Sequence, residues 1–599
     1  MKEKDRVVIS GAAGAWGDSS LSTAQLLADG RSDYIIYEGL AEITMAILAR
    51  ARARDPSQGY ARDIVETIAA HLSDFHRQGI KVITNAGGVN PQAAADLIRT
   101  AAQEAGLNIA VGVVEGDDLS EMIEELRAAG VVEMTTGEAV PESPLAFNAY
   151  LGAQPIATAL EAGADVVVTG RVVDSALVLG PLIHEFGWDP DDHYLLAAGS
   201  LAGHLLECGP QSTGGLLTDW RATTSWTDPG YPIAEIRPDG SFVLTAPEAS
   251  DALVDVRTVA EQLLYEIGDP TCYILPDVVC DWSQVELIQE GDNRVEVVGA
   301  RGMPPTSTLK ACAQVQDGWR AQMLLFIGGR EAVAKARRAG EDLVERGRRM
   351  LAAAGLDDFR EVNIEVLGAE DTYGPHARRQ DTREVVLKIA IHHDDREAVA
   401  RFVREVPSIG LAGPPGVSGG GVGLPRPSPL IRLKSFLIPR EMVVARVDVD
   451  GETAEITHAQ STVHSLAERA VEEGVHPFAP EGETVEVPLV AIAHGRSGDK
   501  GADVNIGVRA RHPDFLPVLL GQVTAETVAE WLSHLGARSV ERYELVGIDA
   551  VNFVLRGGLG AGGTASLRFD PQGKAIAQQL LDMPVRLPIH LADHPALVS

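Results

Sequence analysis

Five short segments of this sequence each place glycine beside polar or charged side chains directly after an apolar run. Carboxylates exchange protons with a substrate, and a guanidinium or the N–H groups of a glycine-rich turn stabilise an oxyanion. The segments are GAAGAWGD (11–18), EG (38–39), NAGGVN (85–90), EGDD (115–118) and GRVVDS (170–175). Their candidate catalytic residues are Asp18, Glu38, Arg171 and Asp174, and their candidate substrate-binding residues are Gly14, Gly17, Ser19, Asn85, Gly87, Gly88 and Asn90.

The apolar runs before these segments read as strands of one sheet. Short runs rich in Val and Ile that alternate with amphipathic helices predict a doubly wound α/β fold, with a mostly parallel sheet covered on both faces. In such sheets a ligand lies outside the carboxyl ends of the strands. We therefore expect Asp18, Glu38, Asn85 and Arg171 to border one site. The runs are 6–10, 33–37, 80–84, 108–114 and 164–170.

The first segment resembles a phosphate-binding turn but departs from it in spacing. Its glycines follow the pattern GxxGxxG, and Ala13 stands where the dinucleotide fingerprint GxGxxG requires glycine. The bulky Trp16 and the acidic Asp18 also disfavour an anion in this loop. Glu38 fits either a ribose-binding acid or a catalytic carboxylate. We therefore expect no binding of NAD or NADP and a polar substrate or thioester site instead.

A second candidate region is GHLLECGPQSTGG, residues 203–215. If its start is helical, His204 and Cys208 lie one turn apart on one face, a spacing that suits a metal ion or a Cys/His pair. Two ligands do not make a metal site, so burial of both side chains is favoured and a metal requirement stays open. His204 and Gln211 are retained as candidate substrate-binding residues.

The third candidate region lies near the end of the chain. HGRSGDKGADVN, residues 494–505, reads as a loop between two apolar strands, and its seven polar or charged side chains exceed what a turn needs. The order strand, strand, helix, strand, strand, helix predicts a small α+β sandwich. We expect this loop to complete the substrate site from the same or a neighbouring subunit. Its candidate catalytic residues are Asp499 and Lys500, and its candidate substrate-binding residues are Arg496, Ser497 and Asn505.

The predicted pattern of strands and helices changes along the chain and divides it into three parts. We predict an α/β part over 1–225, a second α+β part over 226–478 and a C-terminal domain over 483–599, with a linker at 479–485. The stretch 407–427 is so rich in Gly and Pro that we expect no regular structure there. Because it exceeds ordinary connections, we interpret it as a lid or a functional loop.

Composition limits the partners of the chain. Its 599 residues include 51 Lys and Arg and 85 Asp and Glu, which gives a formal charge of −34. Such a surface repels nucleic acids and anionic membranes, so we expect a small-molecule substrate and neither of these partners. Four cysteines without paired spacing and an N-terminus without a signal-peptide pattern predict a cytoplasmic protein. We also expect a homo-oligomer.

Several longer segments, in the same order along the chain, are similar to the acyclic terpene utilisation AtuA-like family. They include GAWGDS, YEGLAEITMAILARARARDPSQGYARD, KVITNAGGVNP, TGRVVDSALVLGPLIHEFGW, GHLLECGPQSTGG and GRSGDKGADVNIGV. The resemblance implies an AtuA core domain followed by a C-terminal domain of ferredoxin-like fold. It also implies the breakdown of acyclic isoprenoids such as citronellol or geraniol as coenzyme A thioesters. One departure is SGAAGAWGD, where the family usually reads like GGSGFWGD.

Residues and resemblance together favour an enzyme that acts on a branched, oxygenated acyl-CoA or a related carboxylate. We expect lyase or hydro-lyase chemistry by general acid and base, without a cofactor, with coenzyme A as the carrier of the substrate. One alternative is a hydrolase of the same substrate class, although the chain offers no GxSxG elbow between an apolar strand and a helix. The other is a non-catalytic binding or assembly subunit of a degradation complex.

Overall fold

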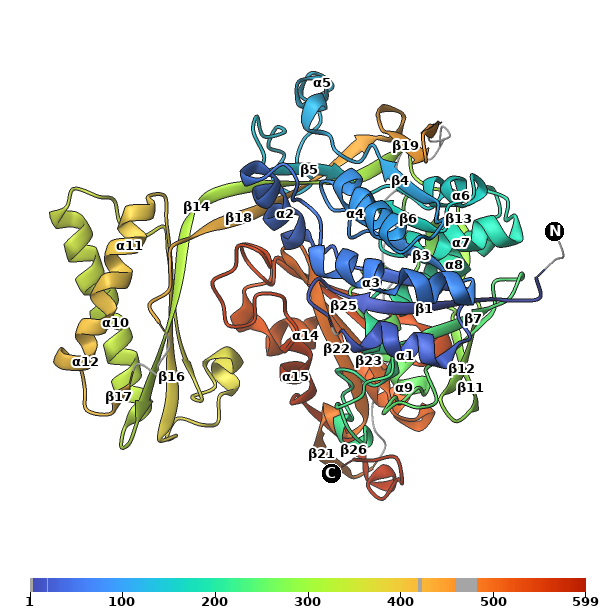
Figure 1. Ribbon diagram of the computed structural model, residues 1–599. Helices are drawn as coiled ribbons and strands as arrows, with labels where there is room; N and C mark the ends of the chain where they lie inside the picture. Colours follow the sequence, from blue (N-terminus) through green and yellow to red (C-terminus); the bar gives the residue numbers. More distant parts are fainter. Residues whose placement is uncertain (1–3, 19, 419–422, 458–481, 599) are drawn as a thin grey trace.

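An eleven-stranded mixed sheet dominates the computed structural model, which describes residues 4–18, 20–418, 423–457 and 482–598 (Figure 1). The five central strands run parallel, which confirms the α/β fold predicted from the alternation of strands and helices. In spatial order these strands are β1 (Val7–Gly14), β2 (Tyr34–Glu38), β3 (Lys81–Thr84), β6 (Val166–Thr169) and β4 (Val111–Glu115).

Helices cover both faces of this parallel part, which explains its continuous apolar runs. Ile35 and Val82 pack toward one helical layer, and the next residues, Ile36 and Ile83, pack toward the other. The first layer contains α1 (Leu21–Asp29), α3 (Arg62–Gln78) and α4 (Pro91–Glu104). The second contains α6 (Gln154–Glu161), α7 (Ala176–Phe186) and α8 (His193–Leu206).

Antiparallel strands extend the sheet at both edges. Strands before and after residue 225 pair with one another, since β7 lies antiparallel to β1. The sheet therefore does not divide at residue 225. On the side of β1 the added strands are β7 (Ile233–Ile236), β8 (Phe242–Thr245), β12 (Arg294–Val298) and β11 (Glu286–Gly291). On the side of β4 they are β19 (Val444–Val449) and β20 (Glu452–Thr457).

A separate lobe projects from this body at the left of Figure 1. The central strand of the lobe is β14, which has 21 residues. It starts in the body, where it pairs with β5 and β18, and ends in the lobe, where it pairs with β16. The helices α10 and α11 cover one face of the lobe sheet. The strands are β5 (Ala146–Ala149), β14 (Thr308–Gly328), β15 (Glu361–Leu367), β16 (Glu384–His393) and β18 (Ser428–Pro439), and the helices are α10 (Ala332–Ala353) and α11 (Arg396–Glu405).

The Gly/Pro-rich stretch 407–427 lies in this lobe and differs from its prediction. It contains one helical turn, α12 (Ile409–Ala412), and a short strand, β17 (Val417–Ser418), that pairs with β14. Pairing with a preformed strand overrides the local composition. Residues 419–422 of the stretch, and 479–481 of the predicted linker, lie outside the described ranges. Within those ranges, no helix combines the length and apolar character needed to cross a bilayer.

The C-terminal part forms the predicted α+β sandwich around a four-stranded antiparallel sheet. One expectation was wrong: 494–505 is not a loop, because all but residues 501–502 belong to the hairpin of β22 and β23. Strand pairing buries most of this segment, and Gly501 makes the turn at φ +64°. The elements are β22 (Ala493–Lys500), β23 (Asp503–Ala510), α13 (Leu516–Gln522), α14 (Ala525–Trp531), β24 (Ser539–Leu545), β25 (Ala550–Arg556) and α15 (Ile576–Leu581), beside the pair β21 (Thr484–Pro488) and β26 (Pro584–Pro588).

The C-terminal sheet docks on residues 264–268, directly after α9 (Val256–Leu263). A Cβ atom at Gly507 would lie 2.4 Å from Cβ of Leu264, so only glycine permits this approach. Asn505 donates to the carbonyl oxygen of Leu264 at 2.9 Å, and Asn552 donates to that of Gly268 at 2.6 Å. The contact is therefore tight in its packing and specific in its hydrogen bonds.

We predict that Gly507→Ala destabilises this contact. The added methyl group overlaps Leu264 in a packed interface, so the free energy of unfolding falls by about 1–3 kcal/mol. Chemical denaturation measures the change. Gly291→Ala is the matched control, because a Cβ atom at Gly291 in β11 meets nothing within 4 Å. Equal stability of the two variants would contradict the tight approach.

Candidate functional site

Four predicted side chains meet at the carboxyl ends of β2, β3 and β6. Oε1 of Glu38 accepts hydrogen bonds from the backbone N–H of Leu40 at 2.6 Å and from Nδ2 of Asn85 at 3.2 Å. Arg171 donates to the carbonyl oxygen of the same Leu40. Nη2 of Arg171 also lies 3.1 Å from Oδ1 of Asp174. We call Glu38, Asn85, Arg171 and Asp174 the strand-exit cluster.

Glu38 is the carboxyl group of the cluster that is best suited to exchange protons. It is 7% exposed, and burial raises its pKa to about 8. The charge of Asp174 acts in the same direction, whereas Arg171 and the hydrogen bond from Leu40 act against it. Glu38 therefore holds a proton at neutral pH and releases it slightly above, which is the range required of a general acid or base.

Side chains of the cluster also hold neighbouring strand ends together. Oδ1 of Asn85, after β3, accepts the backbone N–H of Gly39, after β2, at 2.9 Å. The backbone N–H of Arg171 donates to Oδ2 of Asp117, after β4, at 2.9 Å. A Cβ atom at Gly170 would lie 2.3 Å from Oδ1 of Asp117, so this exit needs its glycine. The glycine and polar pattern of the exits thus has a local structural purpose.

Asp117 and Asn148 form a second polar pair, which contacts the backbone of Arg171. Asp117 is buried, and this burial raises its pKa to about 7, against the hydrogen bonds from Arg171 and Asn148. Nδ2 of Asn148 in β5 donates to Oδ2 of Asp117 at 2.8 Å. Asp117 belongs to the EGDD exit but is not among the predicted site residues, and nothing near Asn148 in the sequence indicates its contact with the segment after β4.

Sequence reasoning also missed a pair of cations around Tyr150. Cζ of Arg171 lies 4.3 Å from the centre of the Tyr150 ring, and Nζ of Lys310 lies 5.3 Å from it. Lys310 belongs to β14, which pairs with β5 in the body. No local pattern reveals this placement, because residues 150 and 310 meet only through that strand pairing.

Asp18 and Gly14 secure the first loop and lie beside the cluster rather than in it. Oδ2 of Asp18 accepts the backbone N–H of Gly14 at 2.9 Å, and Oδ1 accepts the hydroxyl of Tyr231 at 2.8 Å. A Cβ atom at Gly14 would lie 2.5 Å from the carbonyl carbon of Cys208. The glycine loop is therefore covered by backbone of the segment after α8, which contains Cys208.

The other exit residues shape their turns. The backbone N–H of Gly17 donates to Asp63 at 3.0 Å, and Asn90 donates to the carbonyl oxygen of Gln58 at 2.7 Å. Gly87 and Gly88 leave no room for a Cβ atom, which would lie 2.5 Å from the carbonyl oxygen of Thr169 and 2.4 Å from Leu48, respectively. Ser19 lies outside the described residues.

His204 does not form the Cys/His pair that its spacing suggests. Its Nε2 lies 3.1 Å from the carbonyl oxygen of Gln262 and its Nδ1 lies 3.4 Å from Oε1 of Glu207. The ring is 2% exposed and packs against Trp282, with 5.2 Å between ring centres. Burial raises the pKa of the Cys208 thiol well above its ordinary value, so it is not an activated nucleophile.

The C-terminal hairpin meets the core close to this region. Nζ of Lys574 donates to Oε1 of Glu266 at 2.6 Å, and Nζ of Lys500 lies 3.9 Å from Oε2. Although burial opposes it, these two ammonium groups hold the pKa of Glu266 below its ordinary value. Cζ of Arg496 lies 4.5 Å from the centre of the Tyr265 ring. We call Arg496, Lys500 and Lys574 the C-terminal basic group.

Arg496 is the most buried member of this group. It is 5% exposed and donates through Nη2 to the side chain of Gln211. Its Nη1 is buried and makes no hydrogen bond within the described part of the chain. Residues from 203–215 and 494–505, each predicted to line the site, therefore contact one another through Gln211 and Arg496.

Tyr273 in β9 (Tyr273–Ile274) packs against Trp282, with 4.8 Å between the ring centres. Burial raises its pKa to about 12, and the charge of Lys500 opposes this effect. The carboxylates of Glu207 and Asp174 reinforce it. The pKa of Tyr273 therefore responds to charges of both groups, Asp174 in the strand-exit cluster and Lys500 in the C-terminal basic group.

The remaining predicted residues of the hairpin have structural contacts. Ser497 donates to the carbonyl oxygen of Gly573 at 2.6 Å, which fixes the segment before α15. Asn505 accepts the backbone N–H of Glu266 at 2.7 Å. Asp499 lies 3.6 Å from Nζ of Lys574 and so helps to position that cation.

A buried ion cluster outside the predicted set joins the same two parts of the chain. Arg511 donates to Oδ1 and Oδ2 of Asp219 at 2.7 and 2.8 Å, and Nε2 of His494 lies 3.0 Å from Oδ2. Although burial opposes it, the hydrogen bonds from His494 and Arg511 and the charge of Arg511 hold the pKa of Asp219 well below its ordinary value. Burial lowers the pKa of His494. The cluster supplements the hydrogen bonds at 264–268.

Two family models match the chain. A model described as acyclic terpene utilisation family protein AtuA matches residues 7–449, and a model described as AtuA ferredoxin-like domain matches residues 487–586. Comparison with curated proteins and with solved structures gives no match. The first match contains the strand-exit cluster and Lys310, and the second contains the C-terminal basic group.

We predict that Glu38→Gln makes stability less sensitive to pH. The folded protein binds the Glu38 proton more tightly than the unfolded chain, so this stabilisation is present below the unfolded pKa and is lost as pH rises toward about 8. The amide side chain of the Glu38→Gln variant does not ionise, so the variant does not lose this stabilisation as pH rises. Relative to wild type, the variant should gain roughly 3–4 kcal/mol between about pH 5 and pH 8.5.

Thermal melts across this pH range measure the effect. Glu104→Gln, an exposed change at the end of α4, is the control for removing one negative charge. A difference between Glu38→Gln and wild type that stays constant with pH would show that Glu38 is ionised in the folded protein throughout.

Proposed function

This chain belongs to the acyclic terpene utilisation AtuA family, and from that premise we propose that it is a catabolic enzyme of isoprenoid-type compounds. Its proposed substrate is a branched, oxygenated acyl-CoA or a related carboxylate. The proposed reaction is a lyase or hydro-lyase step that proceeds through an enolate. Such a step needs a group that exchanges protons and a cation that stabilises the enolate oxygen.

The observation that carries this proposal is the buried carboxyl group of Glu38. Its pKa of about 8 leaves it protonated at neutral pH, so it donates its proton to the departing hydroxyl group or to the enolate carbon. Asp174 is the second carboxylate of the cluster and is paired with Arg171. A protonated and a charged carboxyl group at one site provide the acid and the base of an elimination.

Arg171 and Lys310 supply the positive charge for the developing oxyanion. They lie on the Tyr150 ring with 4.3 and 5.3 Å between cation and ring centre. Arg171 is 5% exposed, and a cation in such a buried place acts on a nearby oxyanion with little screening by water. Arg171 lies beside Glu38, because both bind the backbone of Leu40, and this arrangement suits an enolate intermediate.

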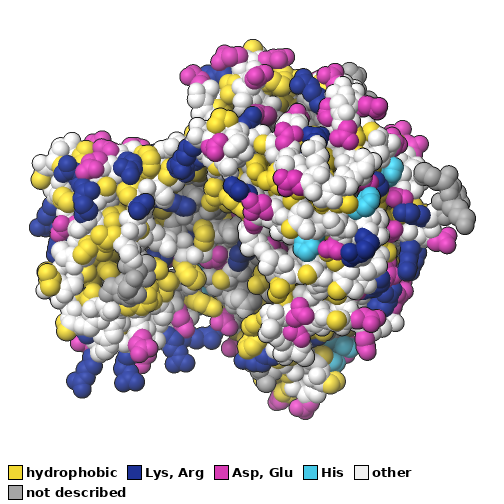
Figure 2. Space-filling view, in the orientation of Figure 1, with side chains coloured by type: hydrophobic (Ala, Val, Ile, Leu, Met, Phe, Trp, Pro, Cys, Tyr) yellow, Lys and Arg dark blue, Asp and Glu magenta, His cyan; other side chains and the backbone are white. Residues whose placement is uncertain are grey.

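The C-terminal basic group suits a second anionic part of the substrate. The chain carries a formal charge of −34, and Figure 2 shows acidic side chains spread over the visible face. An anionic carboxylate or phosphate therefore needs a local cationic site. Arg496 offers a buried Nη1 group without a hydrogen bond in the described structure, and Lys500 reaches toward Glu266 beside it.

The hydrolase alternative has less support. A hydrolase of this class uses an activated nucleophile, and the thiol of Cys208 has a raised pKa. A binding or assembly subunit remains a distinct outcome of the experiments below, because it would bind the substrate without turning it over.

We predict that Glu38→Gln abolishes most of the activity. The amide keeps the size of the side chain but transfers no proton, so kcat should fall by on the order of 10²–10⁴-fold. Turnover of branched 3-hydroxyacyl-CoA thioesters is the assay, with isothermal titration of the same compounds as the binding measurement. Wild-type activity should decline as pH rises through about 8, because Glu38 then loses its proton.

Retained turnover in Glu38→Gln would contradict the assignment of this residue. Binding of the thioesters by the wild type without any turnover would support the binding-subunit alternative instead.

We predict that Lys500→Ala weakens substrate turnover without unfolding the protein. The side chain is 43% exposed and Lys574 still pairs with Glu266, so the free energy of unfolding should fall by no more than about 1 kcal/mol. Loss of a charge that acts on the substrate should lower kcat/KM by on the order of 100-fold. Lys335→Ala, on α10 in the lobe, is the matched control. A lowered melting temperature with unchanged kinetics would make Lys500 a structural residue.

A further inference from the structure

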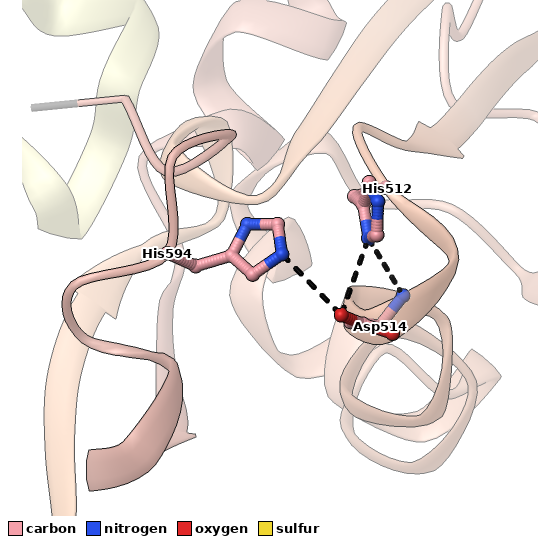
Figure 3. A group of neighbouring side chains, drawn as sticks. All are labelled: His512, Asp514 and His594. Carbon is pink, nitrogen blue, oxygen red and sulfur yellow. Dashed lines mark hydrogen bonds and ion pairs between the residues drawn. The ribbon is translucent and has the colours of Figure 1, made fainter.

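The C-terminal domain contains a group of possible metal ligands away from the strand-exit cluster (Figure 3). His512 and Asp514 flank the start of a short helical turn, η8 (Pro513–Phe515), and His594 comes from the tail after η11 (Ile589–Leu591). One ligand atom of each lies within 4.8 Å of the others. In the described residues this is the sole trio of His, Cys, Asp and Glu that meets this criterion.

We propose that His512, Asp514 and His594 bind a divalent first-row transition-metal ion such as Zn²⁺. Both imidazoles face one oxygen of the carboxylate: Nε2 of His594 lies 3.3 Å and Nδ1 of His512 lies 3.5 Å from Oδ2 of Asp514. Tetrahedral zinc with bonds near 2.0–2.1 Å holds neighbouring ligand atoms about 3.3 Å apart. Two edges of the required ligand triangle are therefore already formed.

The donor set determines the class of ion. Two imidazole nitrogens with one carboxylate oxygen suit Zn²⁺ and its neighbours in the first row, whereas Mg²⁺ and Ca²⁺ prefer oxygen ligands alone. Asp514 has a side chain exposed to 57%, so water has access to a fourth position. Three protein ligands and one open position form a complete coordination sphere for zinc.

Ring contacts fix the positions of the two histidines. The ring of buried Phe515 contacts the ring of His594 edge-on, with 4.8 Å between centres, and the two imidazole rings are 4.6 Å apart. The tail that carries His594 is itself anchored, because Leu597 packs against the core of the domain and the backbone N–H of Val598 donates to Ala491 at 3.1 Å.

A metal ion at this site would replace two hydrogen bonds that backbone N–H groups now make to the imidazole rings. The backbone N–H of Ala596 donates to Nδ1 of His594 at 3.1 Å, so in the metal-free protein the neutral ring carries its proton on Nε2. Metal binding moves that proton to Nδ1 and ends this hydrogen bond. The backbone N–H of Asp514 likewise competes for Nδ1 of His512 at 3.2 Å. We therefore expect a dissociation constant on the order of micromolar rather than the much tighter binding of closed structural sites.

Titration of the full-length protein with Zn²⁺, after treatment with a chelator, tests the proposal. The wild type should bind one equivalent, and Co²⁺ at the same site should give the visible absorption of a four- or five-coordinate ion. His594→Ala and Asp514→Asn should each lower the affinity for Zn²⁺ at least tenfold. His590→Ala, an exposed histidine of the same tail, should leave it unchanged.

Stability provides a second readout that does not depend on any enzymatic activity. Zn²⁺ should raise the melting temperature of wild type and of His590→Ala, but not that of Asp514→Asn, whose exposed change does not affect folding. Absence of saturable binding by the wild type would overturn the proposal. Equal binding by wild type and both ligand variants would also overturn it, because the ion would then lie at other side chains.

Discussion

The contact between the C-terminal sheet and residues 264–268 is the constraint on which the arrangement of the candidate site depends. Gly507 leaves room for the side chain of Leu264, while Asn505 and Asn552 bind the peptide groups of this segment. The same segment carries Tyr265 and Glu266, which contact Arg496, Lys500 and Lys574. A shift of this contact would separate the C-terminal basic group from the core.

Burial of opposite charges shapes the other half of the site. Glu38 and Arg171 bind the two backbone groups of a single residue, Leu40, which keeps them adjacent while Asp174 takes the salt bridge to Arg171. Glu38 is thereby left in a buried place without a full ionic partner, and its pKa rises. Such an arrangement costs stability, and its occurrence at the ligand-binding edge of a parallel sheet is typical of functional sites.

The long strand β14 connects the site to the projecting lobe. Its first half brings Lys310 to Tyr150 through pairing with β5, and its second half forms the lobe sheet with β16. The lobe also contacts the C-terminal domain, since Lys388 donates to the carbonyl oxygen of Leu567. Residues from three distant parts of the sequence are thus held in one framework around the candidate site.

The sequence by itself determined the elements whose cause is local. Alternation of apolar strands with amphipathic helices predicted the parallel sheet. The polar exits predicted that Asp18, Glu38, Asn85 and Arg171 would border one site, since parallel strands end at one edge. Glu38, Asn85 and Arg171 do meet, whereas Asp18 binds the loop beside them. Only the tertiary structure decided which exit residues contact one another and which, like Asn90, instead stabilise a turn through hydrogen bonds to its backbone. It also decided that 494–505 is a buried hairpin and that Lys310 and Lys574 join the candidate site. Strand pairing and domain docking bring these residues together, and their separation along the chain leaves no local pattern.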